Sequence, residues 1–464
     1  MRSMVIPCVA AAAVLMTAGC SGIPSGEATP TPRPTMTLPD FDGDGSADTV
    51  AGLGESQGRV VVQYGVARDQ QIRRSALDGE ESASFGASIL AHDLNDDGLT
   101  DLVVGDPGPD ADPTVWLIPG SKDGLDLAAA TTVAAPSGVG GFGSALAVVA
   151  GAIPRLAVGA PHDTKAAPGG TVVLWQLGSD GKPEGTPTLL TQKKAGIAEK
   201  ARAGDSFGAS LASSGHWLAV GAPRKDVSGV RDAGVVAAVN LSRPDTPVGV
   251  ELGLGLAGAP GAPEAEARFG LSLAAGSTGD QAFLVVGAPL QDAGGPNTGS
   301  IQIYTLTDDA VTSDRAMSAA SLGDGITDGG LFGFDLAMAR PCEGVPGVVV
   351  GMPGAPAGTT PGAGAAWLIP LIAQGGCTPQ KLVVGGAIQG EPSEGAQMGR
   401  AVAALNGGSG GPDSLLLAAP GNAEEGVGSV VLVVRPPYRG YERVAVSGIR
   451  LSEEGVITLS PTMP

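Results

Sequence analysis

Two short segments carry acidic and amide side chains at matching intervals. They read DFDGDGSAD over residues 40–48 and DLNDDGLTD over residues 93–101. Each places side-chain oxygens at its first, third and fifth positions, a glycine for a sharp turn at the sixth and a carboxylate at the ninth. Several oxygen ligands in a flexible arrangement suit Ca²⁺, whereas Mg²⁺ demands near-octahedral geometry and retains more water. We therefore expect each segment to bind one calcium ion.

The seventh position of each segment would contribute its backbone carbonyl. The expected ligands are Asp40, Asp42, Asp44, Ser46 and Asp48 in the first loop, and Asp93, Asn95, Asp97, Leu99 and Asp101 in the second loop. An EF-hand would have Glu at the twelfth position, where this chain has Ala51 and Val104, so the loops are not EF-hands. The sequence predicts about two Ca²⁺ ions per chain.

The composition indicates which elements must position these loops. The 464 residues include 75 Gly and 37 Pro, which helix interiors tolerate poorly. A hydrophobic content of 43% is too high for a disordered chain. Many short strands joined by turns fit both observations. The 27 basic and 47 acidic residues give a net charge of −20, which argues against a nucleic-acid partner.

One sequence unit recurs at intervals of roughly 60 residues. Its first mark is a Phe-Gly pair, which becomes Met-Gly in the last copy. The pairs begin at Phe85, Phe142, Phe207, Phe269, Phe332 and Met398. Each is followed by an apolar run that ends in a turn such as Val158-Gly-Ala-Pro161, and then by a glycine-led strand such as TVVLWQL after Gly170. Val50–Leu53 takes the place of the apolar run in an opening unit without Phe-Gly.

These units resemble the FG-GAP repeat of integrin α chains and their bacterial relatives, over about residues 38–435. The resemblance implies an all-β fold, a seven-bladed β-propeller with four antiparallel strands per blade, and supports the same calcium-binding roles for the two loops. A closed ring of blades buries sheet faces that a single unit would expose. The fourth strand is weakly marked, for example at 71–76. We expect closing strands within residues 441–459, including Tyr441–Val446 and Gly455–Leu459, without deciding which terminus closes the ring.

The N-terminal segment is typical of an exported protein. Residues 1–19 combine a basic start, a short apolar run and small residues, and Thr17-Ala-Gly-Cys20 resembles a bacterial lipobox, which implies lipidation of Cys20. An ordinary secretory signal is the alternative. Residues 20–37 are rich in Pro, Thr and Ser, as in a tether, and 38–464 would form the propeller. We expect the protein to be anchored by lipid to the bacterial cell envelope or cell surface.

Loop positions in such a propeller lead to a disulfide prediction. In an antiparallel blade, the loops between strands 1 and 2 and between strands 3 and 4 share one face. Cys342 and Cys377 are expected in these two loops of the sixth blade. Loops can bring two such residues into disulfide range, and export permits the bond. Because Cys8 and Cys20 belong to the N-terminal segment, Cys342 and Cys377 form the available pair.

A basic segment interrupts the acidic chain. Residues 190–231 contain seven basic and three acidic residues, a local net charge of +4. The basic residues are Lys193, Lys194, Lys200, Arg202, Arg224, Lys225 and Arg231. They are expected in the connection from blade 3 to blade 4 and in the loop between strands 2 and 3 of blade 4, side by side on the face opposite the calcium loops. They would attract an anionic glycan, lipid head group or protein loop, or serve only as solvated loop cations.

The functional interpretation is a non-catalytic recognition or adhesion module that binds an unknown protein or glycan and contacts the membrane only through its lipid anchor. A hydrolase or lyase acting on polysaccharide or lipid is the alternative class. Asp110 with Asp112 and Glu424 with Glu425 are the nearest paired carboxylates for it, and neither pair has a companion base or metal site. A scaffold within an envelope complex is a third interpretation, which the sequence does not separate from the first.

Overall fold

The computed structural model describes residues 39–54, 58–65, 68–77, 79–108, 112–243, 248–278, 281–405, 411–421, 430–438, 441–445 and 456–459. All of them belong to one compact unit. The expected signal peptide, tether and lipidation site at Cys20 lie outside the described residues. Among the described residues, no helix is both long and apolar enough to cross a membrane.

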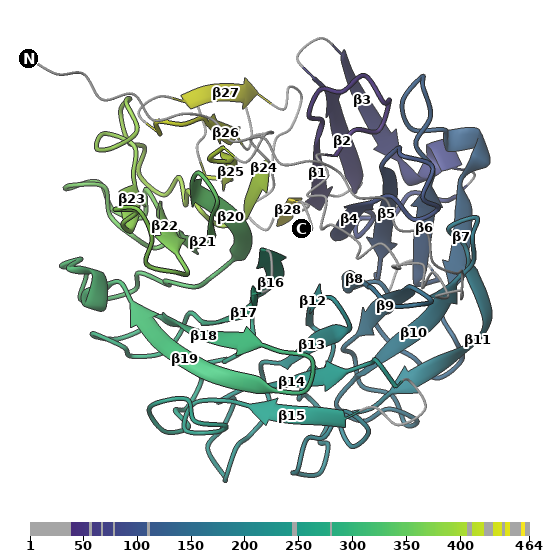
Figure 1. Cartoon of the computed structure of the whole chain (residues 1–464), viewed down its shortest axis with the longest axis horizontal. Helices are drawn as coiled ribbons and strands as arrows, with labels where there is room; N and C mark the ends of the chain where they lie inside the picture. Colours follow the sequence, from purple (N-terminus) through teal and green to yellow (C-terminus); the bar gives the residue numbers. More distant parts are fainter. Residues whose placement is uncertain are drawn as a thin grey trace, which may run out of the picture. The chain divides into compact units, whose positions relative to one another are not determined.

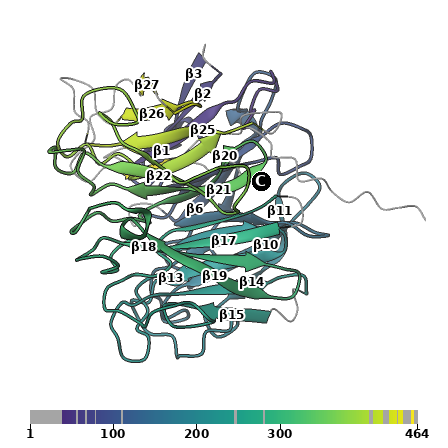
Figure 2. The same ribbon diagram turned by 60° about the vertical axis from the view of Figure 1, so that its left-hand side comes forward.

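The described strands form seven separate four-stranded antiparallel sheets, arranged as the blades of a ring (Figure 1). The innermost strand of each blade lies near the central axis, and the fourth strand lies at the periphery. Seen from the side, the loops that join the strands lie at the two ends of the blades and form two loop faces (Figure 2). The fold is therefore an all-β, seven-bladed β-propeller, as the sequence predicts.

In each of the first four blades, the strands succeed one another from the innermost outward. Blade 1 contains β28 (Val456–Leu459), β1 (Thr49–Gly54), β2 (Arg59–Tyr64) and β3 (Arg68–Arg73). Blade 2 contains β4 (Ser88–His92), β5 (Asp101–Asp106), β6 (Thr114–Ile118) and β7 (Thr131–Ala134). Blade 3 contains β8 (Ala145–Val149), β9 (Arg155–Ala160), β10 (Thr171–Leu177) and β11 (Pro183–Leu190). Blade 4 contains β12 (Ser210–Ser214), β13 (Trp217–Ala222), β14 (Val235–Asn240) and β15 (Val248–Leu252).

The remaining blades follow the same order, and three short 3₁₀ helices lie between strands. Blade 5 contains β16 (Leu273–Thr278), β17 (Gln281–Ala288), β18 (Ser300–Leu306) and β19 (Val311–Ser318). Blade 6 contains β20 (Leu336–Cys342), β21 (Val345–Met352), β22 (Ala365–Pro370) and β23 (Gln380–Leu382). Blade 7 contains β24 (Val402–Leu405), β25 (Ser414–Ala419), β26 (Val430–Val434) and β27 (Tyr441–Ala445). The helices are η1 (Arg74–Leu77), η2 (Leu127–Ala129) and η3 (Ala320–Leu322).

The C-terminal strand closes the ring. β28 pairs antiparallel with β1, with Gly52 opposite Thr458, and so becomes the innermost strand of the first blade. This pairing settles the closure that the sequence leaves open. β27, the other expected closing segment, is the outermost strand of blade 7. The fourth strand of blade 1 begins and ends three residues earlier than the predicted 71–76, because Arg74–Leu77 forms η1 instead.

The repeated glycines join neighbouring blades. Within blade 4, the N–H of Gly208, from the Phe-Gly pair, donates to the carbonyl oxygen of Gly221 at 2.9 Å. The carbonyl oxygen of Gly208 in turn faces Gly159 of blade 3, where a Cβ atom would lie only 2.1 Å from it. The preceding Phe207 is fully buried between the two blades. The repeat therefore requires glycine because a backbone carbonyl of the next blade occupies the side-chain position.

Blade 7 lacks the glycine that accommodates the carbonyl of the next blade. Its apolar run has Ala418 at the position that Gly159 takes in blade 3. The next blade in the ring is blade 1, and no Phe-Gly pair precedes its innermost strand β28 in the sequence. No Phe-Gly carbonyl is thus available to occupy the methyl position, and Ala418 packs in a cluster with Ala51 of blade 1. The degenerate repeat is explained by how the ring closes.

Candidate calcium sites and loop faces

The two acidic loops occupy equivalent places in neighbouring blades. Residues 93–101 join β4 to β5, the first and second strands of blade 2. Residues 40–48 lead directly into β1, the second strand of blade 1. Phe41 and Leu94, at the second position of each loop, are buried and anchor the loops to the cores of their blades. The turns are sharp because Gly45 and Gly98 adopt left-handed backbone conformations, with φ of 82° and 86°.

The loops share one hydrogen-bond network, position by position. In the first loop, the Asp40 carboxylate accepts from the N–H groups of Asp44 and Gly45 at 3.1 and 3.0 Å. In the second loop, the Asp93 carboxylate accepts from Asp97 and Gly98 at 3.2 and 2.9 Å. These bonds hold the first carboxylate of each loop over the turn and leave each oxygen with a lone pair for a cation.

The ninth residue is held in the same way in both loops. Asp48 accepts from the N–H of Phe41 at 2.7 Å and from that of Gly65 at 2.9 Å. Its counterpart Asp101 accepts from Leu94 at 2.9 Å and from Gly120 at 3.0 Å. Gly65 and Gly120 both follow the third strand of their blade. The ninth carboxylate is therefore fixed by its own loop and by the neighbouring strand.

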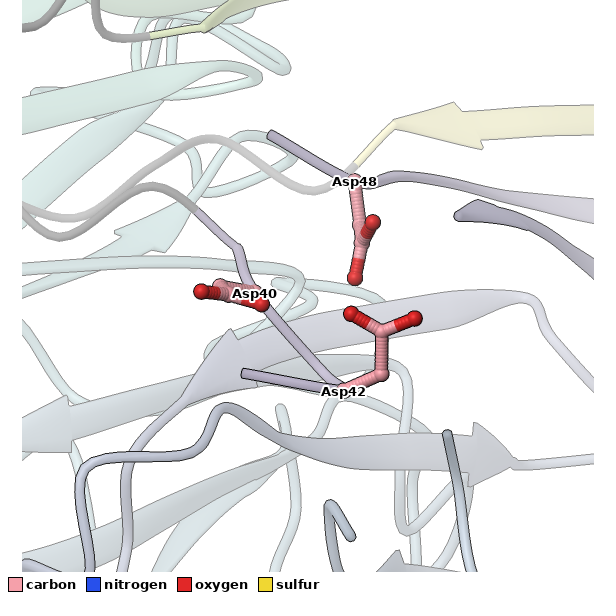
Figure 3. A group of neighbouring side chains, drawn as sticks. All are labelled: Asp40, Asp42 and Asp48. Atoms are coloured by element: carbon pink, nitrogen blue, oxygen red, sulfur yellow. The ribbon is translucent and has the colours of Figure 1, made fainter. Parts of the chain in front are cut away.

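In the first loop, three carboxylates converge. One oxygen from each of Asp40, Asp42 and Asp48 lies within 4.8 Å of the others. Figure 3 shows the carboxylates of Asp42 and Asp48 directed toward each other with Asp40 beside them. Burial raises the pKa of Asp48 to about 6; backbone hydrogen bonds oppose this rise, and the negative charges of Asp42 and Asp40 add to it. Negative charge that a bound cation would neutralise is thus concentrated here.

The second loop differs from the first in one expected calcium ligand. Asn95 stands where the first loop has Asp42, and its side-chain oxygen accepts from the N–H of Asp97 at 2.9 Å. Burial raises the pKa of Asp101 to about 6, and the charges of Asp97 and Asp93 increase it further, although backbone hydrogen bonds lower it. An amide oxygen remains a suitable calcium ligand, so the donor set of the second loop also fits Ca²⁺.

An arginine contacts the first loop. Arg68, at the start of β3, forms an ion pair with Asp42 at 3.0 Å, and its guanidinium lies 3.9 Å from the centre of the Tyr64 ring. The same side chain donates to the carbonyl of Asp123 in the loop that follows β6 of blade 2 at 2.6 Å. Arg68 therefore partly balances the acidic charge at the first site and would compete with a cation for Asp42.

A disulfide lies on the same loop face as the acidic loops. Cys342, the last residue of β20, is bonded to Cys377, which lies between β22 and β23. The bond joins the loop between strands 1 and 2 of blade 6 to the loop between strands 3 and 4 of that blade. It ties the short outer strand β23 to the inner part of the blade.

The basic segment lies on the other loop face. Four of its cations lie between β11 of blade 3 and β12 of blade 4, and the other three lie between β13 and β14 of blade 4. The two stretches are in contact, because Arg202 pairs with Asp226 at 3.1 Å and the N–H of Ser228 donates to Glu199 at 2.7 Å. The expected juxtaposition of the two connections is therefore present.

Lys225 is wrongly assigned to this surface by the sequence. Its side chain is 1% exposed and pairs with the equally buried Asp205 at 3.1 Å. Asp205 also accepts from Gln192 at 3.0 Å and from the N–H of Arg202 at 2.8 Å. Burying an ammonium group requires such a partner. Lys225 is a structural cation that fastens the two connections together.

The other six cations of the segment are exposed. Two of them are balanced locally, since Arg202 pairs with Asp226 and Arg231 pairs with Glu266 in the connection to blade 5. The Lys194 ammonium donates to the carbonyl of Leu189 at 3.0 Å. Within the described part of the chain, Lys193, Lys200 and Arg224 form no ion pair. The positive surface is consequently smaller than the sequence count suggests.

Two buried ion pairs join neighbouring blades and are not predicted from the sequence. Arg340 forms a forked contact with Asp413, with its Nε and Nη2 atoms 3.0 and 2.9 Å from Oδ1. Asp413 directly precedes β25, the place that Asp48 takes before β1, so an arginine from blade 6 balances the carboxylate there. Arg74 pairs with Asp106 at 2.8 Å between blades 1 and 2. The signal for Asp106 was its occurrence where other units have alanine or methionine.

The carboxylates considered for an enzyme are only partly described. Asp110, Glu424 and Glu425 lie outside the described residues. Asp112 precedes β6, where its carbonyl accepts from the hydroxyl of Thr114 at 2.7 Å.

Comparisons with known proteins add little beyond the fold. No protein-family model and no curated protein matches the chain. Among solved structures, the chain is similar to AofleA from Arthrobotrys oligospora, with a TM-score of 0.42 and 11% sequence identity, over 80% of this chain and 89% of that chain. The class that the structure defines is the seven-bladed β-propeller.

Proposed function

We propose that this chain is a calcium-stabilised propeller that recognises an anionic polysaccharide at the cell envelope and performs no catalysis. The assignment of calcium to the two loops rests on the hydrogen-bond network shared by residues 40–48 and 93–101. Two loops of different sequence orient their first and ninth carboxylates through the same backbone donors. Oxygen donors concentrated in this way suit a hard cation with flexible coordination.

The FG-GAP resemblance of the repeats supports the same assignment. It also suggests surface recognition as the role of the propeller, with the partner bound on the face opposite the calcium loops. The lipobox-like sequence ending at Cys20 favours a lipid anchor, which would hold the propeller at the envelope.

The exposed cations of residues 190–231 are the proposed partner surface. Lys193, Lys194, Lys200 and Arg224 are exposed on two connections that touch each other. The chain has a net charge of −20, so most of its surface repels anions. A local positive field on these connections would attract an anionic partner there. A polysaccharide with regularly spaced carboxylates can contact several such cations at once.

The experiment measures retention of the calcium-loaded propeller on polygalacturonate beads, with neutral dextran beads as the reference. Charge reversal at Lys193, Lys200 and Arg224, three exposed cations that form no ion pair within the described part of the chain, should abolish retention and its salt dependence. A matched variant reverses three exposed cations on the calcium face, Lys122, Lys182 and Arg243, with the same change in net charge. Retention that is lost equally in both variants, or in neither, would contradict the assignment of this surface.

A further inference from the structure

A cavity of about 240 Å³ lies on the axis of the propeller. Its wall is formed by the innermost strands of blades 2 to 7 and by the residues that lead into them. The lining is largely apolar and includes Leu90, Leu146, Leu273 and Met338. The space is large enough for a small organic molecule.

The repeat places one equivalent residue at the start of each innermost strand, two positions after the glycine of Phe-Gly or Met-Gly. These residues are Ser88, Ala145, Ser210, Ser272, Asp335 and Ala401. Each serine donates its hydroxyl to a carbonyl of the next blade, as Ser272 does to Gly333 at 2.6 Å. The two alanines show that a blade forms without any polar side chain here. The propeller fold therefore does not require an acid at Asp335.

Asp335 does not replace the serine interaction. Its Oδ2 atom accepts from the N–H of Val402 in blade 7 at 2.7 Å, and both Asp335 and Val402 line the cavity. Although the surrounding blades enclose Asp335, the residue remains partly accessible, because it borders this space. Burial raises the pKa of Asp335 to about 6, and backbone hydrogen bonds from Val402 and Leu336 only partly offset this effect.

The described lining offers no positive charge to Asp335. Among the described residues that line the cavity, Asp335 is the one ionisable group. The nearby Arg400 is exposed and lies 5.1 Å from the centre of the Phe334 ring. A carboxylate in a largely apolar cavity is costly unless a cation joins it there.

We propose that the axial cavity binds a small organic ammonium ion, with Asp335 as its counter-charge and the apolar wall in contact with its hydrocarbon part. A divalent metal ion is a poor occupant, because it needs six or more oxygen ligands. The cavity offers one carboxylate among apolar side chains and four serines, whose hydroxyls already donate to backbone carbonyls. An alkylammonium ion instead matches both the single charge and the apolar lining. This site is separate from the calcium loops and from the basic surface.

The test is a calorimetric titration with n-butylammonium chloride near pH 7.5, where the carboxylate of Asp335 is ionised, with calcium present in excess. The critical variant is Asp335→Ser, which restores the serine of the equivalent blades, and Asp335→Asn is the second variant should the first fold poorly. Either change should weaken n-butylammonium binding by at least about tenfold. n-Butanol, which has the same chain without the charge, should bind weakly and equally to the unmodified protein and the variant.

A control in the innermost strand of blade 4 is Ser213→Ala, which removes a hydrogen bond to the carbonyl of Val148 but no charge. Ser213 lies outside the described lining, so this change should leave ammonium affinity unchanged. Circular dichroism confirms that each variant retains its strands. The proposal is overturned if the unmodified protein does not bind n-butylammonium, if the Asp335 variants bind it equally well, or if n-butanol binds as tightly as the ammonium ion.

Discussion

Asp40 and Thr100 connect the two acidic loops. The N–H of Asp40 donates to the Thr100 hydroxyl at 3.0 Å, and the N–H of Thr100 donates to the Asp40 carbonyl at 2.9 Å. Asp40 is the first expected ligand of one site, and Thr100 directly precedes Asp101, the last expected ligand of the other. Two hydrogen bonds therefore join the loops of the two candidate sites directly.

Replacing Thr100 with Val tests this connection. The change keeps the shape of the side chain but leaves the N–H of Asp40 without its side-chain acceptor. We expect a loss of about 1 kcal/mol, or roughly fivefold in calcium affinity, mainly at the first site. Isothermal titration with Ca²⁺ measures it, and Thr114→Val on the other loop face serves as the control. An unchanged affinity at the first site would show that this contact does not organise it.

Arg68 is expected to weaken calcium binding at the first site. Because its guanidinium pairs with Asp42, a calcium ion must displace or share that contact. We expect Arg68→Gln to tighten the first site by roughly threefold, the scale of an exposed ion pair, and to leave the second site unchanged. Lys165→Gln, on the opposite loop face, controls for the change in net charge. Weaker binding in Arg68→Gln would mean that Arg68 supports the loop instead of competing for it.

The interlocking glycines predict a sharp sensitivity to a single methyl group. Gly159→Ala would place its Cβ atom against the carbonyl oxygen of Gly208 and force the two blades apart. We expect a loss of about 1–3 kcal/mol in the free energy of unfolding. Ala418→Gly, at the equivalent position of blade 7, should cost only about 0.5–1 kcal/mol, because it removes a tolerated methyl group. Urea denaturation of both variants provides the comparison. Equal losses in the free energy of unfolding would contradict the proposed packing of the Gly208 carbonyl against Gly159.

The fold is predictable from the sequence because the contact between neighbouring blades requires particular residue types. Phe207-Gly208 and its counterparts occur in every blade whose glycine carbonyl packs against a glycine of the preceding blade. Only glycine leaves room for that carbonyl, so the contact is visible in the sequence. The ring closure was not recoverable, since β28 carries no Phe-Gly pair and its pairing with β1 spans the whole chain. Lys225 looked like its exposed neighbours because its burial depends on Asp205 and Gln192, which a charge count does not reveal.

Asp335 should give the stability of the propeller a distinctive pH dependence. Burial raises its pKa from 3.8 to about 6, so the folded state holds a proton that the unfolded chain releases over this range. Stability contributed by this group therefore falls as the pH rises from about 4 to about 6 and stays lower above it. A rise of about two units in the pKa corresponds to a change of about 3 kcal/mol in the free energy of unfolding.

The Asp335→Asn variant isolates this effect from Asp48 and Asp101, which titrate in the same range. Relative to the unmodified protein, its free energy of unfolding should increase by up to about 3 kcal/mol between pH 4 and pH 7.5. Urea denaturation at the two pH values measures the change. A difference between the two proteins that does not vary with pH would contradict the assignment.

The most direct test of the calcium sites is the number of ions bound per chain. Isothermal titration of the metal-free propeller with Ca²⁺ should give about two sites, and a saturating ion should raise the melting temperature by mass action. Asp48→Asn and Asp101→Asn should each reduce the count to about one, and the double variant should bind none and lose the thermal gain. A protein that binds no calcium, or whose double variant still binds two ions, would contradict the assignment of residues 40–48 and 93–101 as calcium sites.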